Sequence, residues 1–342
     1  MAKIQKEEPL PMTLLKIFER KYPTAFPTCD DIRTGKGVDL PDWHSICSIP
    51  ISATVAMHHH LNADDFFPSS CAALYAWRKH KAIYNFDPSL AEMLMAQGSS
   101  NLDIPTEILF TIPYNCFWIQ YDNSGGLFVW IEHDIKTDSF ELRLLLATEE
   151  KGFTESIPVH LIEGGTVYDG IKATYDVIKE NLPSDAAKAD MSELMKCQSD
   201  YAAKIIQLIL YLCAENKDVK KKSTRSARTK KSGVDYSAPK TWDVGFRIGN
   251  AIRKYDEAQA EAENDGKNDD GNEDNTENGD DPMIKNVATR SHRRPHTRRG
   301  HYHHFWTGSE KDDSRKIILR WVAPTFINGS AKDIVTTVHK VK

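Results

Sequence analysis

The sequence has few cysteines and no C-x-x-C pair. Its six cysteines are Cys29, Cys47, Cys71, Cys116, Cys197 and Cys213. This scattered spacing argues against a zinc ribbon and against a disulfide framework. We therefore expect reduced and mostly buried thiols, as in a cytoplasmic protein.

Long hydrophobic runs are also missing. The N-terminus has no apolar stretch of about 7 to 15 residues after its basic residues, as a secretory signal would require. The most apolar run, residues 205–213, is about half the length of a membrane span. With 40% hydrophobic and 9% aromatic residues, the chain is predicted to be a soluble, folded protein that is not exported.

Motifs for common enzyme chemistry are absent as well. The sequence contains no G-x-x-x-x-G-K-[ST], and the segment TGKGVD at 34–39 is too short to replace that loop. It contains neither G-x-S-x-G nor H-E-x-x-H. Nucleotide hydrolysis, serine hydrolysis and zinc peptidase activity therefore have no support.

Charge, in contrast, is abundant and arranged in blocks. Residues 217–231 carry eight basic residues and one acidic residue, 256–281 carry twelve acidic residues and Lys267, and 285–299 carry six Lys or Arg and no acid. Such blocks contain too little apolar surface to offset the entropy of ordering, and they are usually solvated. They indicate boundaries between the packed parts of the chain.

The pattern of the first 215 residues predicts an α+β fold with an antiparallel meander sheet packed with helices. Helical spacing covers 69–87, where Leu74, Trp77, Lys81 and Tyr84 share a face, and continues over 88–98. Five β-rich runs follow at 107–113, 116–122, 126–134, 141–148 and 156–165, too close together for crossover helices. Helices are predicted again at 166–183, capped by Thr166, and at 200–216.

The last third is predicted to hold a C-terminal helix and a β-hairpin. The predicted helix within 240–263 would bury Val244, Ile248, Ala251 and Ile252 and expose Arg247, Arg253 and Lys254. Strands at 300–308 and 315–328 would form the hairpin. The resulting boundaries are a body at 1–215, a basic loop at 216–240, a helix at 241–263, a disordered acidic insertion at 264–284, and a basic loop, hairpin and tail at 285–342.

Histidine-rich segments raise the question of a metal site. Strand alternation places His301 and His303 on one face and His304 on the other, and the nearby arginines would repel a dication. The triplet at 58–60 is expected to be an exposed helix end or loop. An EF-hand pattern at 270–281 has Asn275 and Asp281 where glycine and glutamate belong. We predict no metal, no cofactor and no catalytic residue.

Nucleic-acid binding is a stronger alternative. Arginines interleaved with histidines and followed by Tyr302, Phe305 and Trp306 would suit phosphates and bases. A ribonuclease using a histidine pair as general acid and base is a further hypothesis. The opposite interpretation is that the aromatic residues fill a core and that the arginines pair with Asp243, Asp256 or the acidic insertion.

The order of the C-terminal motifs carries a family resemblance. The segment RPHTRRGHYHHFWTG at 294–308, followed by RWVAPTFIN at 320–328, closely resembles the signature R-P-H-x-R-R-G-H-[WY]-H-x-[FY]-W-x-G and R-W-x-x-P-x-x-[VI]-N of the type V-A anti-CRISPR family found in phages and plasmids. The blocks at 66–87, 104–119, 208–216 and 244–255 look similar in the same order, so the resemblance spans roughly 65–328.

The resemblance implies an adaptor function. Members of this family lower the level of the type V-A CRISPR effector nuclease by recognising its nascent N-terminal peptide, after which the messenger RNA is lost. The expected partners are this peptide and the ribosome or the messenger, without a membrane, in the cytoplasm of the bacterial host. His304 and the acidic insertion depart from the signature. These departures leave three alternatives open: the target is the same nuclease, another nascent chain, or nothing related to CRISPR.

The predicted peptide- or RNA-binding residues all match the signature. Trp306 and Trp321 are expected to form a hydrophobic wall, with core packing as the alternative. His301 and His303 would offer hydrogen bonds, and the arginines would hold acidic groups or phosphates. The full set is Arg294, His296, Arg298, Arg299, His301, His303, Trp306, Arg320 and Trp321.

Overall fold

The computed structural model describes residues 8–35, 48–60, 67–98, 103–134, 138–180, 185–222, 238–265, 296–308 and 316–327. The acidic insertion from residue 266 onward, most of the basic segment after Lys222, and Arg294 lie outside these ranges. In the described part, no helix combines the length and apolarity needed to cross a membrane.

Helices and strands follow one another in a mixed order. The helices are α1 (Leu10–Lys21), α2 (Ala25–Gly35), α3 (Ser48–His58), α4 (Pro68–Trp77), α5 (Pro88–Ala96), the 3-10 helix η1 (Thr106–Thr111), α6 (Val167–Glu180), α7 (Asp185–Cys213) and α8 (Phe246–Asp265). The strands are β1 (Ala82–Phe86), β2 (Cys116–Gln120), β3 (Gly125–Asp134), β4 (Ser139–Thr148), β5 (Gly152–Leu161), β6 (Val219–Lys221), β7 (Lys240–Val244), β8 (His296–Arg298), β9 (His301–Thr307), β10 (Lys316–Val322) and β11 (Thr325–Ile327).

The main sheet has the order β5-β4-β3-β2-β1-β7-β6. The predicted antiparallel meander is confirmed for β2 to β5. The prediction did not include β1, which lies parallel to both β2 and β7. The α+β class is therefore confirmed, while the sheet also contains strands that are distant along the chain.

The helix predicted over 69–87 is wrong in its second half. Helix α4 ends at Trp77, and the chain turns through Lys81, whose φ is 48°, into strand β1. The indole Nε1 of Trp77 donates to the carbonyl of Ala82 at 2.9 Å and fixes this turn. Strand β1 is covered on both faces, so its residues do not alternate between apolar and polar as those of a half-exposed strand do. Without this alternation, the spacing of its apolar residues resembled that of a helix.

Three other predictions fail for related reasons. The run 107–113, expected to be a strand, begins in the 3-10 helix η1, which starts after Pro105 and ends before Ile112. Residues 240–244, expected at the start of a helix, form β7, and α8 begins after Gly245 at a positive φ of 74°. Part of the predicted basic loop forms β6. Short apolar segments do not reveal their partners, and pairing decides their structure.

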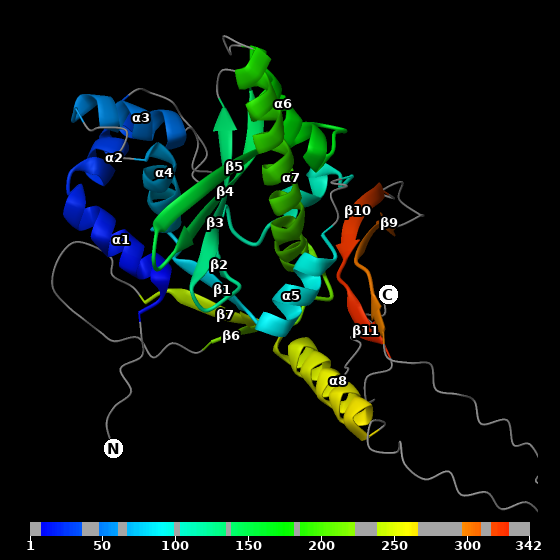
Figure 1. Ribbon diagram of the computed structural model, residues 1–342. Helices are drawn as coiled ribbons and strands as arrows, with labels where there is room; N and C mark the ends of the chain where they lie inside the picture. The colour runs from blue at the N-terminus through cyan, green and yellow to red at the C-terminus, as the bar shows by residue number, and fades with distance from the viewer. Residues whose placement is uncertain are drawn as a thin grey trace, which may run out of the picture.

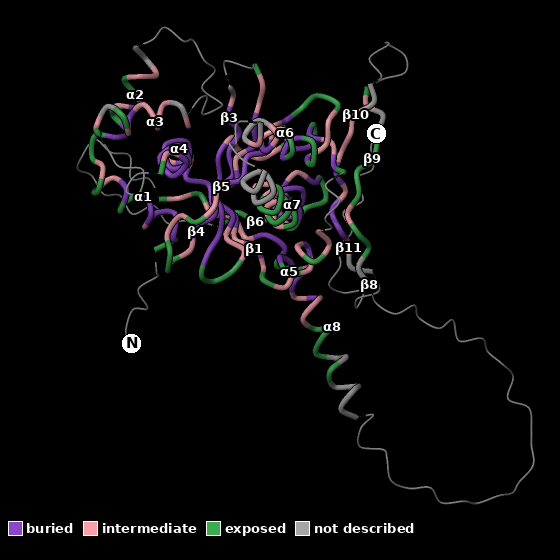
Figure 2. Tube along the Cα trace, turned by 45° about the horizontal axis from the view of Figure 1, so that its top comes forward, coloured by how far each residue is buried: buried purple, intermediate pink, exposed green. Residues whose placement is uncertain are grey.

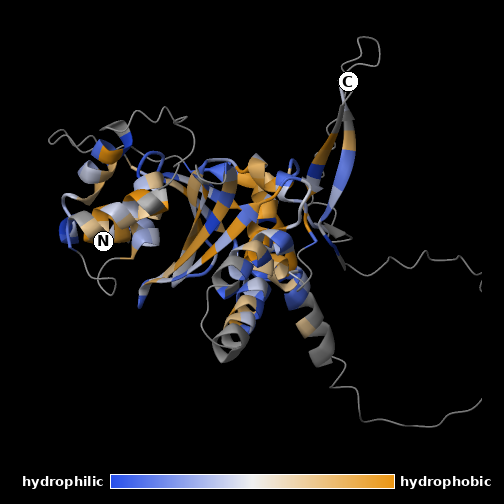
Figure 3. Cartoon of the chain, turned by 90° about the horizontal axis from the view of Figure 1, so that it is seen from above, coloured by the Kyte–Doolittle hydropathy of each residue, from blue (hydrophilic) through white to orange (hydrophobic). Residues whose placement is uncertain are grey.

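Two hydrophobic cores lie on opposite faces of the sheet. Helices α5, α6 and α7 cover one face and α1 to α4 cover the other (Figures 1 and 3). Alternation along β3 sends Leu127, Val129 and Ile131 into the first core and Phe128 and Trp130 into the second. The predicted buried helix at 200–216 is confirmed as the second half of α7.

The C-terminal hairpin is a ribbon that leans on the first core. Strands β9 and β10 pair antiparallel, as predicted, and β8 and β11 extend them. The register is continuous, since the pairs Val322 with His301 and Thr325 with Arg298 keep the same offset. We call residues 296–307 and 316–327 together the C-terminal ribbon.

Candidate functional site

Strand β10 attaches the C-terminal ribbon to the body of the protein. It packs against α7 and η1, and β9 lies on its outer side (Figure 1). Trp321 is 7% exposed and joins the first core together with Ala323 and the partly buried Leu319. Trp321 therefore belongs to the core, the alternative left open above, and does not form an exposed binding wall. Trp306 lies in β9, but its side chain is outside the described set.

The position of the Trp321 ring explains why residue 300 is a glycine. A Cβ atom at residue 300 would lie 2.7 Å from Cζ2 of Trp321 and 3.0 Å from Cδ of Pro324. The indole thus occupies the space that a side chain at Gly300 would need. The signature glycine, tryptophan and proline pack together as a single structural unit.

A second attachment interrupts the ribbon between β10 and β11. Pro324 has no N–H group to donate across the ribbon. The N–H of Ala323 donates to Oδ1 of Asn216, at 3.0 Å, just beyond the end of α7. Arg320 forms an ion pair with Glu215, the preceding residue. The predicted ligand-holding arginine is therefore already engaged with the body, and it helps to fix the ribbon.

The outer strand of the ribbon is exposed over consecutive residues. Residues 301–305 are all exposed, which Figure 2 shows along β9. Residues opposite one another share a face, so His303 lies on the face of Arg320, and Tyr302 on the face of Trp321. His301 and His303 share one face, and His304 is on the other, as predicted. The rings of His303 and Phe305 are 4.9 Å apart between centroids.

The remaining predicted residues lie near the base of the ribbon. Arg298 and Arg299 are exposed at the junction of β8 and β9. His296 begins β8, although nothing is described of its side chain, and Arg294 lies outside the described ranges. The structure thus brings His301, His303 and Arg320 to one face and places two arginines beside it. Within the described ranges, no three His, Cys, Asp or Glu side chains converge in a way that could hold a metal.

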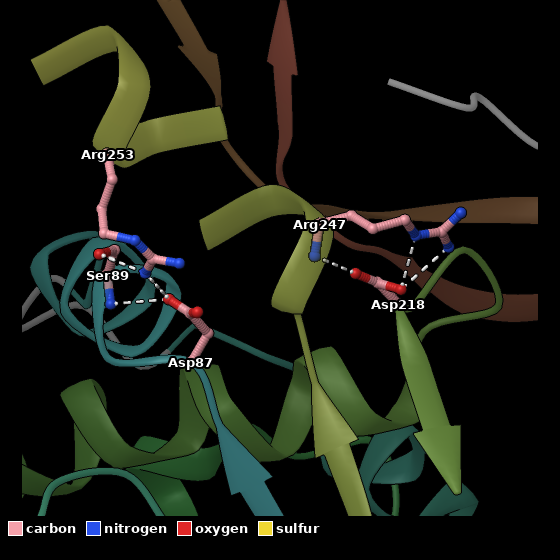
Figure 4. A network of polar contacts seen from close by, with 5 residues as sticks. All are labelled: Asp87, Ser89, Asp218, Arg247 and Arg253. Carbon is pink, nitrogen blue, oxygen red and sulfur yellow. Dashed lines mark hydrogen bonds and ion pairs between the residues drawn. The ribbon is translucent and has the colours of Figure 1, made fainter. Parts of the chain in front are cut away.

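Sequence reasoning missed the residues that support this arrangement. Arg247 on helix α8 is exposed as predicted, but Arg253 is only partly exposed. Arg253 donates to Asp87 Oδ1 at 2.7 Å and to Ser89 Oγ at 3.1 Å (Figure 4). The nearby Asp87 carboxylate raises the pKa of Arg253. Arg247 donates its Nε to Asp218 Oδ1 and its backbone N–H to Asp218 Oδ2, each at 2.9 Å.

These contacts connect several of the signature blocks. Asp87 ends the block at 66–87, and Gly249 in the block at 244–255 leaves room for it, because a Cβ there would lie 2.0 Å from Asp87 Oδ1. Glu215 and Asn216 end the block at 208–216 and hold the ribbon. Asp243, one proposed partner of the arginines, instead pairs with Lys222 at 2.5 Å. The order of the blocks indicated that they belong to one structure. The spacing of the residues could not identify which side chains form contacts between the blocks.

Two grooves lie away from the ribbon. One, of about 890 Å³, is lined by α1, Phe67 and the turn between β4 and β5. The other, of about 620 Å³, is lined by η1, the start of β4, the end of β5 and Ala173 of α6. Neither groove is lined by a ribbon residue, so the exposed side chains of β9 do not form part of either groove.

Comparison with models of known protein families identifies one family. The model of the AcrVA2-like family, described as anti-CRISPR type V subtype A2, matches residues 84–329. A crystal structure of AcrVA2 is similar with a TM-score of 0.54 and 15% identity, covering 94% of this chain and 100% of that chain. This likeness concerns the fold. A search of curated proteins found no significant match.

Proposed function

The chain belongs to the AcrVA2-like family, anti-CRISPR type V subtype A2, and on this basis we propose that it lowers expression of the type V-A CRISPR effector nuclease. In this proposal the protein recognises the nascent N-terminal peptide of the nuclease and triggers loss of the encoding mRNA. It would act on the ribosome or the messenger in the cytoplasm of the bacterial host. The protein would be an adaptor, and the decay would be carried out by other factors.

The observation that carries the proposal is the exposed strand β9 on a firmly attached ribbon. In the described sheet β9 pairs only with β10. An extended peptide can add to such an edge through main-chain hydrogen bonds, and the exposed His301, His303 and Phe305 then select its side chains. Attachment through Trp321, Glu215 and Asn216 fixes the strand before the peptide binds. Such preorganisation reduces the entropy lost on binding.

The central experiment separates peptide recognition from nucleotide recognition. The nuclease is expressed with and without this protein from two altered genes, one encoding a changed N-terminal peptide and one carrying synonymous codons for the native peptide. We expect the nuclease mRNA to fall for the synonymous gene and to persist for the changed peptide. mRNA loss that follows the nucleotide sequence and ignores the peptide would refute the proposal.

A matched set of variants tests the ribbon in the same assay. We expect the double substitution His301→Ala and His303→Ala to weaken mRNA loss and His304→Ala, on the opposite face of β9, to leave it unchanged. Equal effects of the two would show that the chosen face of β9 is not the contact surface.

RNA binding is the second candidate function, favoured by the exposed Arg298 and Arg299 next to β9. Arginines in such a position can hold phosphates in a salt-dependent manner. Purified protein is titrated with labelled single-stranded RNA at increasing salt, and the RNA is examined for cleavage. Binding without cleavage supports an RNA-contacting adaptor, whereas cleavage lost in His301→Ala or His303→Ala supports a ribonuclease.

A further inference from the structure

The groove of about 620 Å³ has a composition that the ribbon lacks. Its lining includes the apolar side chains of Phe110, Phe140 and Ile162. It also includes the carboxylates of Glu107, Asp138 and Glu163. No Lys or Arg lines it among the described residues. We call this groove, between η1, β4, β5 and α6, the acidic groove.

The apolar side chains of the acidic groove are available to a ligand. Phe110 is 43% exposed and Ile162 is 39% exposed, although both are large and hydrophobic. The ring of Phe110 meets that of Phe140 edge-on, with centroids 5.5 Å apart and an interplanar angle of 88°. An apolar ligand side chain placed here would remove water from the exposed surface of Phe110.

The walls are held in place by hydrogen bonds between the elements. Thr106 at the start of η1 is buried, and its Oγ1 donates to the carbonyl of Ile162 at 2.7 Å. The N–H of Gly164 donates to Glu107 Oε1 at 3.1 Å. These bonds join η1 to the end of β5, so that the groove is formed before a ligand arrives.

The carboxylates of the acidic groove favour a positively charged ligand. Glu107 and Glu163 are exposed and can approach a cation, while Asp138 lies 3.0 Å from Nε2 of His133. On α6, Lys172 beside Ala173 is paired with Asp176. A negative, partly apolar groove complements a ligand with a positive group next to an apolar side chain.

We propose that the acidic groove binds a peptide segment in which Lys or Arg neighbours a large apolar residue. The volume suits a few residues, within the usual range of about 300–1,000 Å³ for ligand sites. This site is separate from the ribbon and does not depend on the nuclease as the target. Both involve η1, since Phe110 lines the groove and β10 packs against η1, but no ribbon residue lines the groove.

The test uses fluorescein-labelled hexapeptides and full-length protein. One panel carries a single Lys flanked by Leu, Phe or Met, and a matched panel carries Gln in place of Lys. Fluorescence anisotropy is measured at two salt concentrations. We expect the preferred Lys peptide to bind about tenfold more tightly than its Gln partner, and the difference to shrink at high salt.

Two variants locate the binding. Phe110→Ala and Glu163→Gln change exposed side chains, and each is expected to weaken the preferred peptide about fivefold to tenfold. Ile17→Ala and Glu149→Gln, in the groove beside α1, are the matched controls and should bind as the unaltered protein does. The proposal is overturned if no Lys peptide binds more tightly than its Gln partner, or if both groove variants bind normally.

Failure of this proposal and failure of the proposed function are distinguishable. A protein with an empty acidic groove can still lower nuclease expression through the ribbon. Conversely, His303→Ala should leave hexapeptide binding unchanged, because His303 does not line the groove.

Discussion

Truncation of Trp321 should detach the C-terminal ribbon while leaving the body folded. This side chain is the main apolar contact from the ribbon to the first core and is 7% exposed. A tryptophan buries about 200 Å², and at about 25 cal/mol per Å² this area corresponds to about 5 kcal/mol. Measured Trp→Ala changes in cores cost about 3–5 kcal/mol. Since about 1.4 kcal/mol changes an equilibrium tenfold, a cost of about 3–5 kcal/mol means that Trp321→Ala should weaken docking of the ribbon by a factor of roughly 10² to 4 × 10³.

Hydrogen exchange measured by mass spectrometry reports this change. Amides of β9 and β10 should exchange faster in Trp321→Ala by about the same factor, and amides of β3 and β4 should keep their protection. Trp321→Phe is the control, because it retains most of the ring contacts. It also removes Nε1, which is buried without a hydrogen-bond partner among the described residues, so no hydrogen bond of these residues is lost. Trp321→Phe should therefore weaken docking of the ribbon by only about 1 kcal/mol. Unchanged ribbon protection in Trp321→Ala, or equal loss in β3, would refute the reasoning.

Three further predictions concern stability. Gly300→Ala forces a Cβ against the Trp321 ring and should lower the free energy of unfolding by about 1–3 kcal/mol in urea titrations, the range for overpacking; an unchanged midpoint would contradict the close packing. Burial raises the pKa of Glu132 from 4.5 to about 7, so the folded protein keeps a proton that the unfolded chain has released. The free energy of unfolding should thus fall as pH rises from about 4.5 to 7. Between these pH values Glu132→Gln should become more stable relative to the parent by about 3 kcal/mol. If the free energies of unfolding of the two proteins change in parallel with pH, Glu132 does not titrate in this range. Arg253→Ala leaves Asp87, which is 8% exposed at its side chain, without its cation and should lower the free energy of unfolding by about 1–3 kcal/mol. Asp256→Ala, at an exposed position of the same helix, should lower it by less than about 0.5 kcal/mol.

The candidate site was predictable as a segment but not as a set of contacts. Alternation along the strand correctly divided His301 and His303 from His304. The same alternation could not decide whether Trp321 faces solvent or core, because both sides of a two-stranded ribbon look alike in sequence. The pairing of Arg320 with Glu215 was not predictable either, since the sequence offers many carboxylates to each arginine.

Local regularities of the sequence determined the meander β2 to β5, the capped start of α6, the buried half of α7 and the hairpin β9–β10. In α6, for example, Thr166 Oγ1 accepts from the N–H of Asp169 at 3.2 Å, as its cap position predicts. Each of these depends on residues close along the chain, where periodicity and turn chemistry act directly.

Only the tertiary structure decided which elements meet across long distances. Strand β1 is a strand because β2 and β7 pair with it on both sides, and α8 begins at Phe246 because β7 ends in the sheet. The ribbon is fixed because Trp321, Glu215 and Asn216 come together at the end of α7. Such contacts depend on chain closure over many residues and on shape, and no local pattern records either.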